Sequence, residues 1–286
     1  RRRLWQASLL AGCSSSAEVA SAEVASPELA ALNSAESYGV MPDSASTLQP
    51  TVRRMTPAEI VRRLGAAEHR AVFLGEHHNA AADHLLQAGV IRQLHAQRNQ
   101  RDMAVGLEAV QRRFQPVLDA YVAGRIGEEE LEMGTEWRTR WFWPFAGYLP
   151  VFRACKELGV RLLALNVDSE DLSKVETGGL PALSRGALQS YVPDATGFSA
   201  FASTTAFKEY VAYVIKPSYA MHQRMGILRT TITGQKLEED MSFRNFYSGR
   251  ILWDETMAST AAAWCAAKIL RGRPLRPRWL PTPTRP

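Results

Sequence analysis

The sequence is poor in cysteine and has no long apolar run, and each absence excludes a class of protein. Its three cysteines among 286 residues give neither a disulfide framework nor the spacing of a zinc site. No stretch of 18 or more apolar residues occurs, so the sequence predicts no membrane-spanning helix. Apolar residues make up 46% and charged residues 22%, a globular composition that excludes a wholly disordered or fibrous chain.

The common glycine-rich and nucleophile motifs are also missing. No G-x-G-x-x-G follows the first apolar run and no P-loop occurs, so nothing indicates a cradle for a dinucleotide or a phosphate. G-x-S-x-G and H-E-x-x-H are absent too, which argues against the usual serine-hydrolase and zincin arrangements.

The formal net charge of +5 is concentrated at the two ends of the chain. Residues 1–3 and 271–286 carry eight arginines and no acid, so residues 4–270 hold 26 basic and 29 acidic groups. A groove for nucleic acid is built from basic residues that cluster on the fold. The slightly acidic body therefore argues against nucleic acid as a partner.

Residues 1–50 are expected to form a targeting and tethering segment. Three arginines precede a short apolar stretch, as in an export signal, and the paired arginines resemble a twin-arginine signal. Residues 9–13 (Leu-Leu-Ala-Gly-Cys) resemble a lipobox, in which Cys13 would carry the lipid. Residues 14–50 hold too few large apolar groups to offset the entropy of ordering, so we expect a flexible tether. These features favour export to a bacterial envelope, with an N-terminal membrane tether, or import into a plastid.

Between residues 55 and 270, short apolar runs alternate with helical patterns. The runs at 71–75, 103–107 and 160–165 predict buried strands, and helices are predicted near 80–97, 114–121, 128–132 and 151–158. Thr56, Pro57 and Glu59 predict a capping box that opens the folded region. Residues 200–268 have helical patterns interrupted at Pro217. The predicted fold is therefore α/β: a parallel-sheet core flanked by helices, with a C-terminal helical part.

Polar side chains follow each of the three predicted strands. In an open parallel sheet, ligands bind outside the carboxyl ends of the strands. Carboxylates and imidazoles at that edge can bind a metal, move a proton or hold a polar ligand. The strand-end residues are Glu76, His77 and His78 after the first strand, Glu108 after the second, and Asn166 and Asp168 after the third.

Aromatic residues gather between positions 137 and 148. Such a cluster is most often part of a core, but three tryptophans between positions 137 and 143 are also suited to a flat apolar surface for a planar ligand such as a porphyrin. The helical part adds side chains that could ligate haem iron, and Tyr219 and His222 share one helical face because they are three residues apart. The aromatic cluster comprises Trp137, Trp141, Phe142, Trp143, Phe145 and Tyr148; the possible iron ligands are Tyr210, Tyr213, Tyr219, His222 and Tyr247.

An ordered series of motifs resembles the ChaN-like domain of the haem-binding uptake, Tiki superfamily. Residues 73–78 (Phe-Leu-Gly-Glu-His-His) and 83–87 (Asp-His-Leu-Leu-Gln) begin the series, and residues 106–108 (Gly-Leu-Glu) continue it. The aromatic cluster with Pro150, and then residues 164–166, follow in order. Residues 241–245 and 252–258 resemble the final helical segment of the family. The resemblance spans residues 55–265.

The resemblance implies an α/β fold, haem as ligand, and a role in haem uptake or iron homeostasis. Haem is then expected between the strand-end residues and the helical part, and a homodimer is a further expectation. The expected haem contacts are Glu76, His77, His78, Glu108, Trp141, Tyr148, Asn166, Tyr219, His222, Asp254 and Glu255.

Two alternatives remain open at this point. Related branches of the superfamily are metal-dependent, so the chain is also compatible with an esterase- or peptidase-like hydrolase. Glu76 or Glu108 would then be the general base, and His77, His78 and His84 would hold a divalent metal that lowers the pKa of bound water. The other alternative is a tethered interaction module without a ligand.

The sequence departs from the family pattern after residue 257. The family continues into another strand that ends in a Gly/His motif, whereas residues 271–286 are rich in arginine and proline and contain no histidine. Proline lacks the backbone donor that a central strand requires. We expect residues 271–286 to form a disordered tail.

Overall fold

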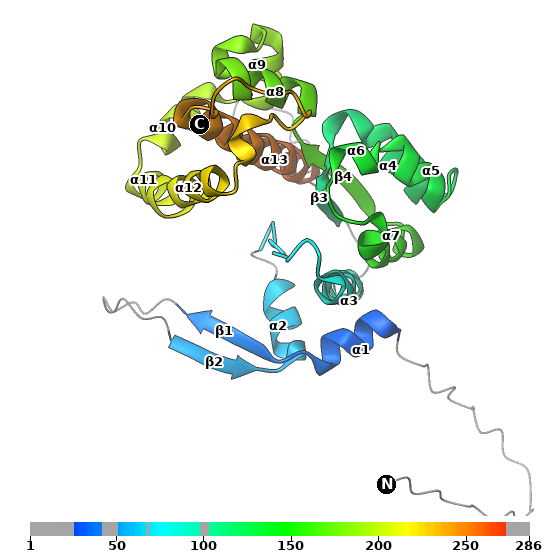
Figure 1. The fold of residues 1–286 in the computed structure, drawn as a ribbon. Coiled ribbons are helices and arrows are strands. Elements are labelled where there is room, and N and C mark those ends of the chain that lie inside the picture. Colours follow the sequence, from blue (N-terminus) through cyan, green and yellow to red (C-terminus); the bar gives the residue numbers. More distant parts are fainter. Residues whose placement is uncertain (1–25, 42–50, 67–68, 98–102, 273–286) are drawn as a thin grey trace, which may run out of the picture.

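Two small sheets organise the chain in the computed structural model, which describes residues 26–41, 51–66, 69–97 and 103–272 (Figure 1). β1 (Ser37–Met41) pairs antiparallel with β2 (Thr51–Met55). β3 (Ala104–Gln111) pairs parallel with β4 (Arg161–Asn166), with a register shift between Leu107 and Gln111. The parallel pair, its helices and the C-terminal helix confirm the predicted α/β fold class.

The first predicted strand is not formed. Residues 71–77 make no ladder with the other described strands, and the Phe73 side chain is 95% exposed. An apolar run becomes a buried strand only when a neighbour supplies hydrogen bonds and a packing surface. Here the run stays an extended segment that leads into α3 (Ala81–Gln97), so the prediction of a strand at 71–75 is wrong.

The N-terminal elements pack around α3. α2 (Pro57–Leu64) begins with the predicted capping box, in which Thr56 and Glu59 bond each other's backbone N–H groups. α1 (Pro27–Ser34) lies against α3 at Gly89, where an added Cβ would stand 2.5 Å from the Glu28 carbonyl oxygen. Residues 26–41 therefore differ from the predicted flexible tether, because Leu32 finds an apolar partner surface on α3.

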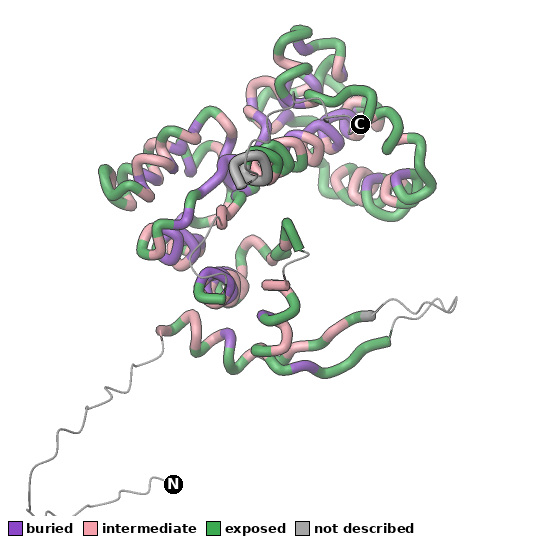
Figure 2. The backbone as a smooth tube through the Cα atoms, turned by 180° about the vertical axis from the view of Figure 1, so that it is seen from behind, coloured by how far each residue is buried: buried purple, intermediate pink, exposed green. Residues whose placement is uncertain are grey.

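The principal core lies between the parallel sheet and its crossover helices, which begin after the 3₁₀ turn Arg112–Phe114. Most of the aromatic cluster is buried there: Trp137 and Phe145 pack against Phe152, which is 1% exposed. Figure 2 shows this buried layer, and it shows that β1 and β2 are largely exposed. The crossover helices are α4 (Gln115–Val122), α5 (Glu128–Gly134), α6 (Trp137–Arg140) and α7 (Phe145–Leu158).

The chain after β4 is helical, as predicted. Pro217 stands in the first turn of α12, directly after a π-helix (Val211–Ile215). The backbone stays helical from residue 205 to residue 224, so the prediction that Pro217 interrupts the helix is wrong. The α-helical hydrogen bonding changes to the π pattern just before the proline, which lacks a backbone N–H. The helices are α8 (Ser169–Gly178), α9 (Arg185–Tyr191), α10 (Ala195–Ala202), α11 (Thr205–Tyr210), α12 (Lys216–Arg224) and α13 (Phe243–Gly272), with 3₁₀ turns at Leu180–Ala182 and Ile227–Arg229.

Helix α13 continues to Gly272, two residues into the segment expected to be a tail. Residues 273–286 lie outside the described residues, as do residues 1–25 with Cys13 and the lipobox-like piece. The predictions of a disordered tail and of a targeting segment therefore remain predictions. Within the described ranges, no helix combines the length and the hydropathy that crossing a bilayer requires.

Candidate functional site

The Glu76 carboxylate is the centre of a polar cluster between the extended segment, α3 and α7. Its Oε1 accepts hydrogen bonds from the Tyr148 hydroxyl and lies 2.7 Å from His78 Nδ1, and its Oε2 accepts one from Gln87 Nε2 at 3.0 Å. Gln87 lies on α3 and Tyr148 on α7, so the packing of these helices creates the site. Three of the roughly four acceptor positions of the carboxylate are thus engaged.

His84 completes this cluster from the first turns of α3. Its ring is 1% exposed and lies 4.0 Å from the Tyr148 ring, in the space left by Gly147. His84 Nε2 stands 3.3 Å from Glu76 Oε2, close enough for an ion pair but without hydrogen-bond geometry. His84 Nδ1 has no hydrogen-bond partner among the described residues.

The charges in the cluster follow from this geometry. Burial by itself would raise the pKa of Glu76, but the hydrogen bonds from His78, Tyr148 and Gln87 outweigh it and lower the pKa. Burial raises the pKa of Tyr148, and the bond to Glu76 raises it further. Glu76 is therefore an ionised acceptor at neutral pH and Tyr148 a neutral donor. The arrangement stabilises an anion within the fold and leaves Glu76 little capacity to act as a general base.

His77 faces a different partner. Its backbone N–H and its Nδ1 both lie within 3.0 Å of Asp83 Oδ2, and its side chain is 88% exposed. The backbone bond from His77 is the main cause of the lowered pKa of Asp83. Asp83 thereby fastens the extended segment to the first turn of α3.

The predicted metal ligands His77, His78 and His84 are not assembled into a metal site. Across the described residues, no three His, Cys, Asp or Glu side chains are placed so that they could hold a metal ion. The physical reason is that His77 turns to Asp83, while His78 packs on Trp141 and Trp143. The structure therefore gives no support to the divalent metal that the hydrolase alternative requires.

Glu108 is exposed and lies within β3 rather than after it, because β3 continues to Gln111. Its Oε1 accepts a hydrogen bond from Trp253 Nε1 of α13 at 2.9 Å. Asn166 donates to the Glu108 carbonyl and accepts from the backbone of Val167, and it is only 4% exposed. Asn166 therefore joins the ends of β3 and β4, and both the oxygen and the nitrogen of its side-chain amide are hydrogen-bonded.

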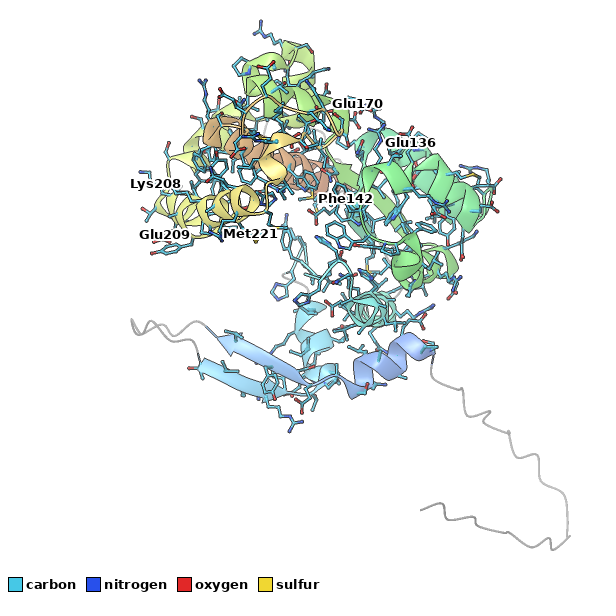
Figure 3. All side chains as sticks on the ribbon, viewed as in Figure 1. Glu136, Phe142, Glu170, Lys208, Glu209 and Met221 are labelled. Carbon is cyan, nitrogen blue, oxygen red and sulfur yellow. The ribbon has the colours of Figure 1, made fainter. Side chains whose placement is uncertain are left out.

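The aromatic cluster is mostly core and not a ligand surface. Trp141 and Tyr148, two of the expected haem contacts, are 6% and 5% exposed and bond each other through Trp141 Nε1 and the Tyr148 oxygen. Phe142 alone in the cluster projects into solvent, 79% exposed, beyond the end of α6 (Figure 3). Trp141 and Tyr148 are thus covered by protein in this structure, and their role as haem contacts stays a prediction.

The two expected iron ligands of the helical part have internal partners. The Tyr219 hydroxyl donates to the Met241 carbonyl at 2.9 Å. His222 Nδ1 lies 2.8 Å from the Ser218 carbonyl and Nε2 lies 3.0 Å from the Arg250 guanidinium, and burial lowers the pKa of His222. Their role as ligands stays a prediction, and it would require both side chains to exchange partners.

Asp254 and Glu255 lie in the middle of α13. Asp254 accepts a hydrogen bond from the Tyr210 hydroxyl at 2.8 Å, and burial raises the pKa of both carboxyl groups. Burial also raises the pKa of Tyr210, so its phenol is kept as a neutral donor to Asp254. These contacts hold α11 against α13.

An exposed face runs along the π-helix and α12; sequence reasoning named only Tyr213 of it, as one of five possible iron ligands. Tyr213 is 79% exposed, and Val214, Met221 and Met225 on the same face are 48%, 46% and 63% exposed. These four residues are called the tyrosine–methionine face below. Val214 and Met221 are two helical turns apart, and Met221 and Met225 are one turn apart. This spacing is visible in the sequence and would have indicated the face. Figure 3 labels Met221 on α12.

Comparison with known proteins gives one informative finding. The family model described as haem-binding uptake, Tiki superfamily, ChaN matches residues 64–274. No curated protein and no solved structure matches the chain. The matched range contains the Glu76 cluster, both strands of the parallel sheet and all of α13.

Proposed function

We propose that this chain, which belongs to the ChaN family of the haem-binding uptake, Tiki superfamily, binds haem and serves haem uptake or iron homeostasis. The match confirms the family that the ordered motifs indicated. The observation that supports a binding place is the tyrosine–methionine face, an apolar surface with an accessible phenol inside the matched range.

The tyrosine–methionine face has the chemistry that a flat, dianionic porphyrin needs. The Tyr213 hydroxyl makes no hydrogen bond with a described residue, unlike those of Tyr210 and Tyr219. When bound, haem supplies an iron centre that accepts tyrosine oxygen or histidine nitrogen as a ligand. Met221 and Met225 offer adaptable apolar contact to the ring.

Helix α12 carries two cations, one of them beside the tyrosine–methionine face. Lys216 and Arg224 are exposed, lie on the same helix, and form no ion pair with a described acid. Arg224 is three residues from Met221 and lies on the same side of α12, whereas Lys216 is nine residues from Met225 and lies on the opposite side. Arg224 is therefore available for a propionate group of haem, because a charge-assisted bond to a carboxylate is among the stronger hydrogen bonds.

The strand-end residues belong to the same proposal. Glu108 acts by its charge both on Tyr148 of the Glu76 cluster and on Arg250 of α13, so it links the strand ends with the helical part. Glu108 is the exposed member of that group. A homodimer stays a prediction from the resemblance.

The proposal is tested by titrating the purified protein with hemin and following the Soret band. We expect Tyr213→Phe to weaken hemin binding at least about tenfold, because losing one ligand worth about 1.4 kcal/mol raises the Kd by that factor. The variant should also lose the absorption bands of a tyrosinate-ligated iron. Tyr219→Phe and His222→Gln are the matched variants, and both should keep the spectrum.

A Soret shift that Tyr213→Phe leaves unchanged and that His222→Gln abolishes would transfer the ligand role to His222. No spectral change in the unmodified protein at micromolar hemin would overturn haem binding itself.

We also propose that the protein is exported or imported into an organelle, on the basis of the arginines at 1–3 and the lipobox-like residues 9–13. If Cys13 carries a lipid, bacterial expression with a labelled fatty acid should label the full chain, and Cys13→Ser should remove the label and release the protein from membranes. Cys155→Ser is the control, because that thiol is buried. Labelling that persists in Cys13→Ser would contradict the lipoprotein form.

A further inference from the structure

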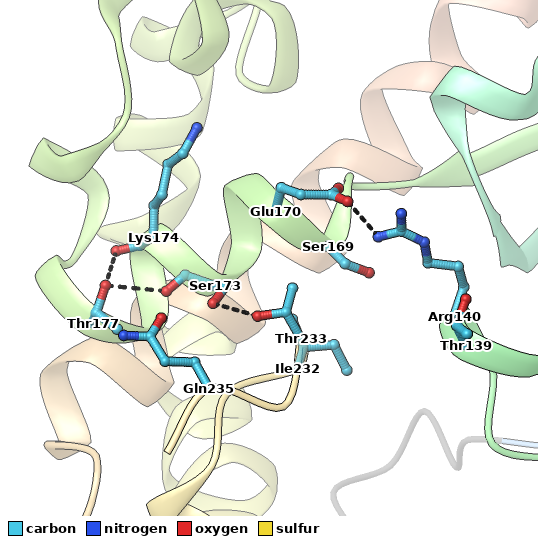
Figure 4. Close-up of a pocket in the computed structure, with 10 residues that line it drawn as sticks. All are labelled: Thr139, Arg140, Ser169, Glu170, Ser173, Lys174, Thr177, Ile232, Thr233 and Gln235. Atoms are coloured by element: carbon cyan, nitrogen blue, oxygen red, sulfur yellow. Dashed lines mark hydrogen bonds and ion pairs between the residues drawn. The ribbon is translucent and has the colours of Figure 1, made fainter. Parts of the chain in front are cut away.

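A polar cavity of about 480 Å³ lies between α6, α8 and the hairpin 230–236, and the functions assigned above do not use it (Figure 4). Small-molecule sites occupy about 300–1,000 Å³ and are lined mostly by apolar side chains. This cavity has one aliphatic lining residue, Ile232, and is otherwise polar. The other lining residues are Thr139, Arg140, Ser169, Glu170, Ser173, Lys174, Thr177, Thr233 and Gln235.

The hairpin that forms one side of the cavity is fixed firmly to α8. Thr231 N–H bonds the Gln235 carbonyl across the hairpin, and Ile232 N–H bonds Glu176 Oε2 at 2.7 Å. Ser173 donates to Thr231 and accepts from Thr233, both at 2.9 Å. Ser173 and Thr231 are 6% and 4% exposed, so buried hydroxyl groups hold the hairpin in place. The cavity is therefore preformed, which lowers the entropic cost of binding.

The charges around the cavity balance one another. Arg140 pairs with Glu136 at 2.6 Å and with Glu170 at 2.7 Å. Arg113 also pairs with Glu170, at 2.8 Å, and Lys174 pairs with Asp171 at the same distance. Each cation already has a carboxylate, and each of these carboxylates has a cation. Neither a phosphate nor an organic cation is favoured by such a site.

The groups that remain free are both donors and acceptors. The Gln235 side-chain amide is exposed and makes no hydrogen bond with a described residue. Hydroxyl oxygens keep a second lone pair after accepting one bond. Such groups suit a ligand that carries several hydroxyls and no net charge.

We propose that this cavity binds a small neutral polyhydroxylated molecule of the carbohydrate class. Ring hydroxyls bond the Gln235 amide and the Thr233 oxygen, while the aliphatic face of the sugar lies on Ile232. The cavity shares no residue with the tyrosine–methionine face, so the proposal does not depend on haem binding.

The test is saturation-transfer NMR on the full chain with glucose as the probe, at millimolar concentration and without hemin. We expect glucose signals that saturate with concentration. Gln235→Ala should weaken glucose binding about fivefold, the factor for one hydrogen bond. Thr233→Val should act in the same direction, because it removes the hydroxyl and keeps the side-chain shape. Lys236→Ala is the matched control on the same hairpin and should leave binding unchanged, since Lys236 does not line the cavity.

Inorganic phosphate and glucosamine are the competing probes. If either competes with glucose more strongly than galactose does, the site selects charge and the proposal of a neutral ligand is overturned. Absence of saturable glucose transfer, or transfer that Gln235→Ala and Thr233→Val leave unchanged, also overturns it. Circular dichroism of each variant checks that it is folded like the unmodified protein, so that lost binding is not due to unfolding.

Discussion

Phe152→Ala is expected to lower the free energy of unfolding by about 3–5 kcal/mol, the cost of deleting a fully buried aromatic ring and leaving a cavity. Phe152 lies on α7, is 1% exposed, and contacts the rings of Tyr121, Trp137 and Phe145. The core that it fills joins the parallel sheet to its crossover helices. The measurement is equilibrium unfolding in urea, with the midpoint and slope fitted separately.

Phe142→Ala is the matched control for Phe152→Ala. The chemical change is the same, and Phe142 belongs to the aromatic cluster of which Trp137 and Phe145 pack against Phe152, but Phe142 is 79% exposed. Surface substitutions usually change stability by no more than about 0.5 kcal/mol. Equal losses for the two variants would show that the core is not arranged as described.

Glu76→Gln is expected to lower the free energy of unfolding by about 2 kcal/mol at pH 7. The variant replaces an ionised acceptor with a neutral amide, and hydrogen bonds to a charged group contribute about 1.5–3 kcal/mol. The Tyr148 hydroxyl and Gln87 amide would then meet an NH₂ group at one of the two oxygen positions. Urea unfolding at pH 7 measures this difference.

The difference in stability between the unmodified protein and Glu76→Gln is expected to depend on pH. The folded pKa of Glu76 lies below its ordinary value of 4.5, because the bonds from His78, Tyr148 and Gln87 outweigh burial. A lowered folded pKa contributes stability above the unfolded pKa, and that contribution is lost as the pH falls through the folded value. The stability advantage of the unmodified protein over Glu76→Gln should therefore shrink as the pH falls below about 5.

Glu129→Gln provides the control for pH, because Glu129 is exposed on α5 and forms no ion pair with a described residue. It should match the unmodified protein to within about 0.5 kcal/mol at every pH. A difference between Glu76→Gln and the unmodified protein that is independent of pH would mean that Glu76 is not the ionised centre of its cluster.

Part of the site could be predicted from the sequence and part could not. The motif around Glu76, His78 and Gln87 indicated that these side chains act together, and they do meet around one carboxylate. The roles within the cluster depended on α7, which brings Tyr148 from 72 residues away. Likewise, the hydrogen bonds of Tyr219 and His222 are made with Met241 and Arg250. These partners are distant in the chain, so a local sequence pattern does not reveal them.

The sequence by itself determined the local elements and the family. Thr56 and Glu59 cap α2 through neighbouring backbone groups. The tertiary structure decided which apolar runs became strands and which polar groups stayed free. Residues 71–75 have the composition of a strand, yet a strand exists only with a neighbour. Tyr213 is exposed, whereas the Tyr219 hydroxyl is hydrogen-bonded to Met241. The difference was not visible in the sequence, because burial and hydrogen-bond partners are supplied by residues distant in the chain.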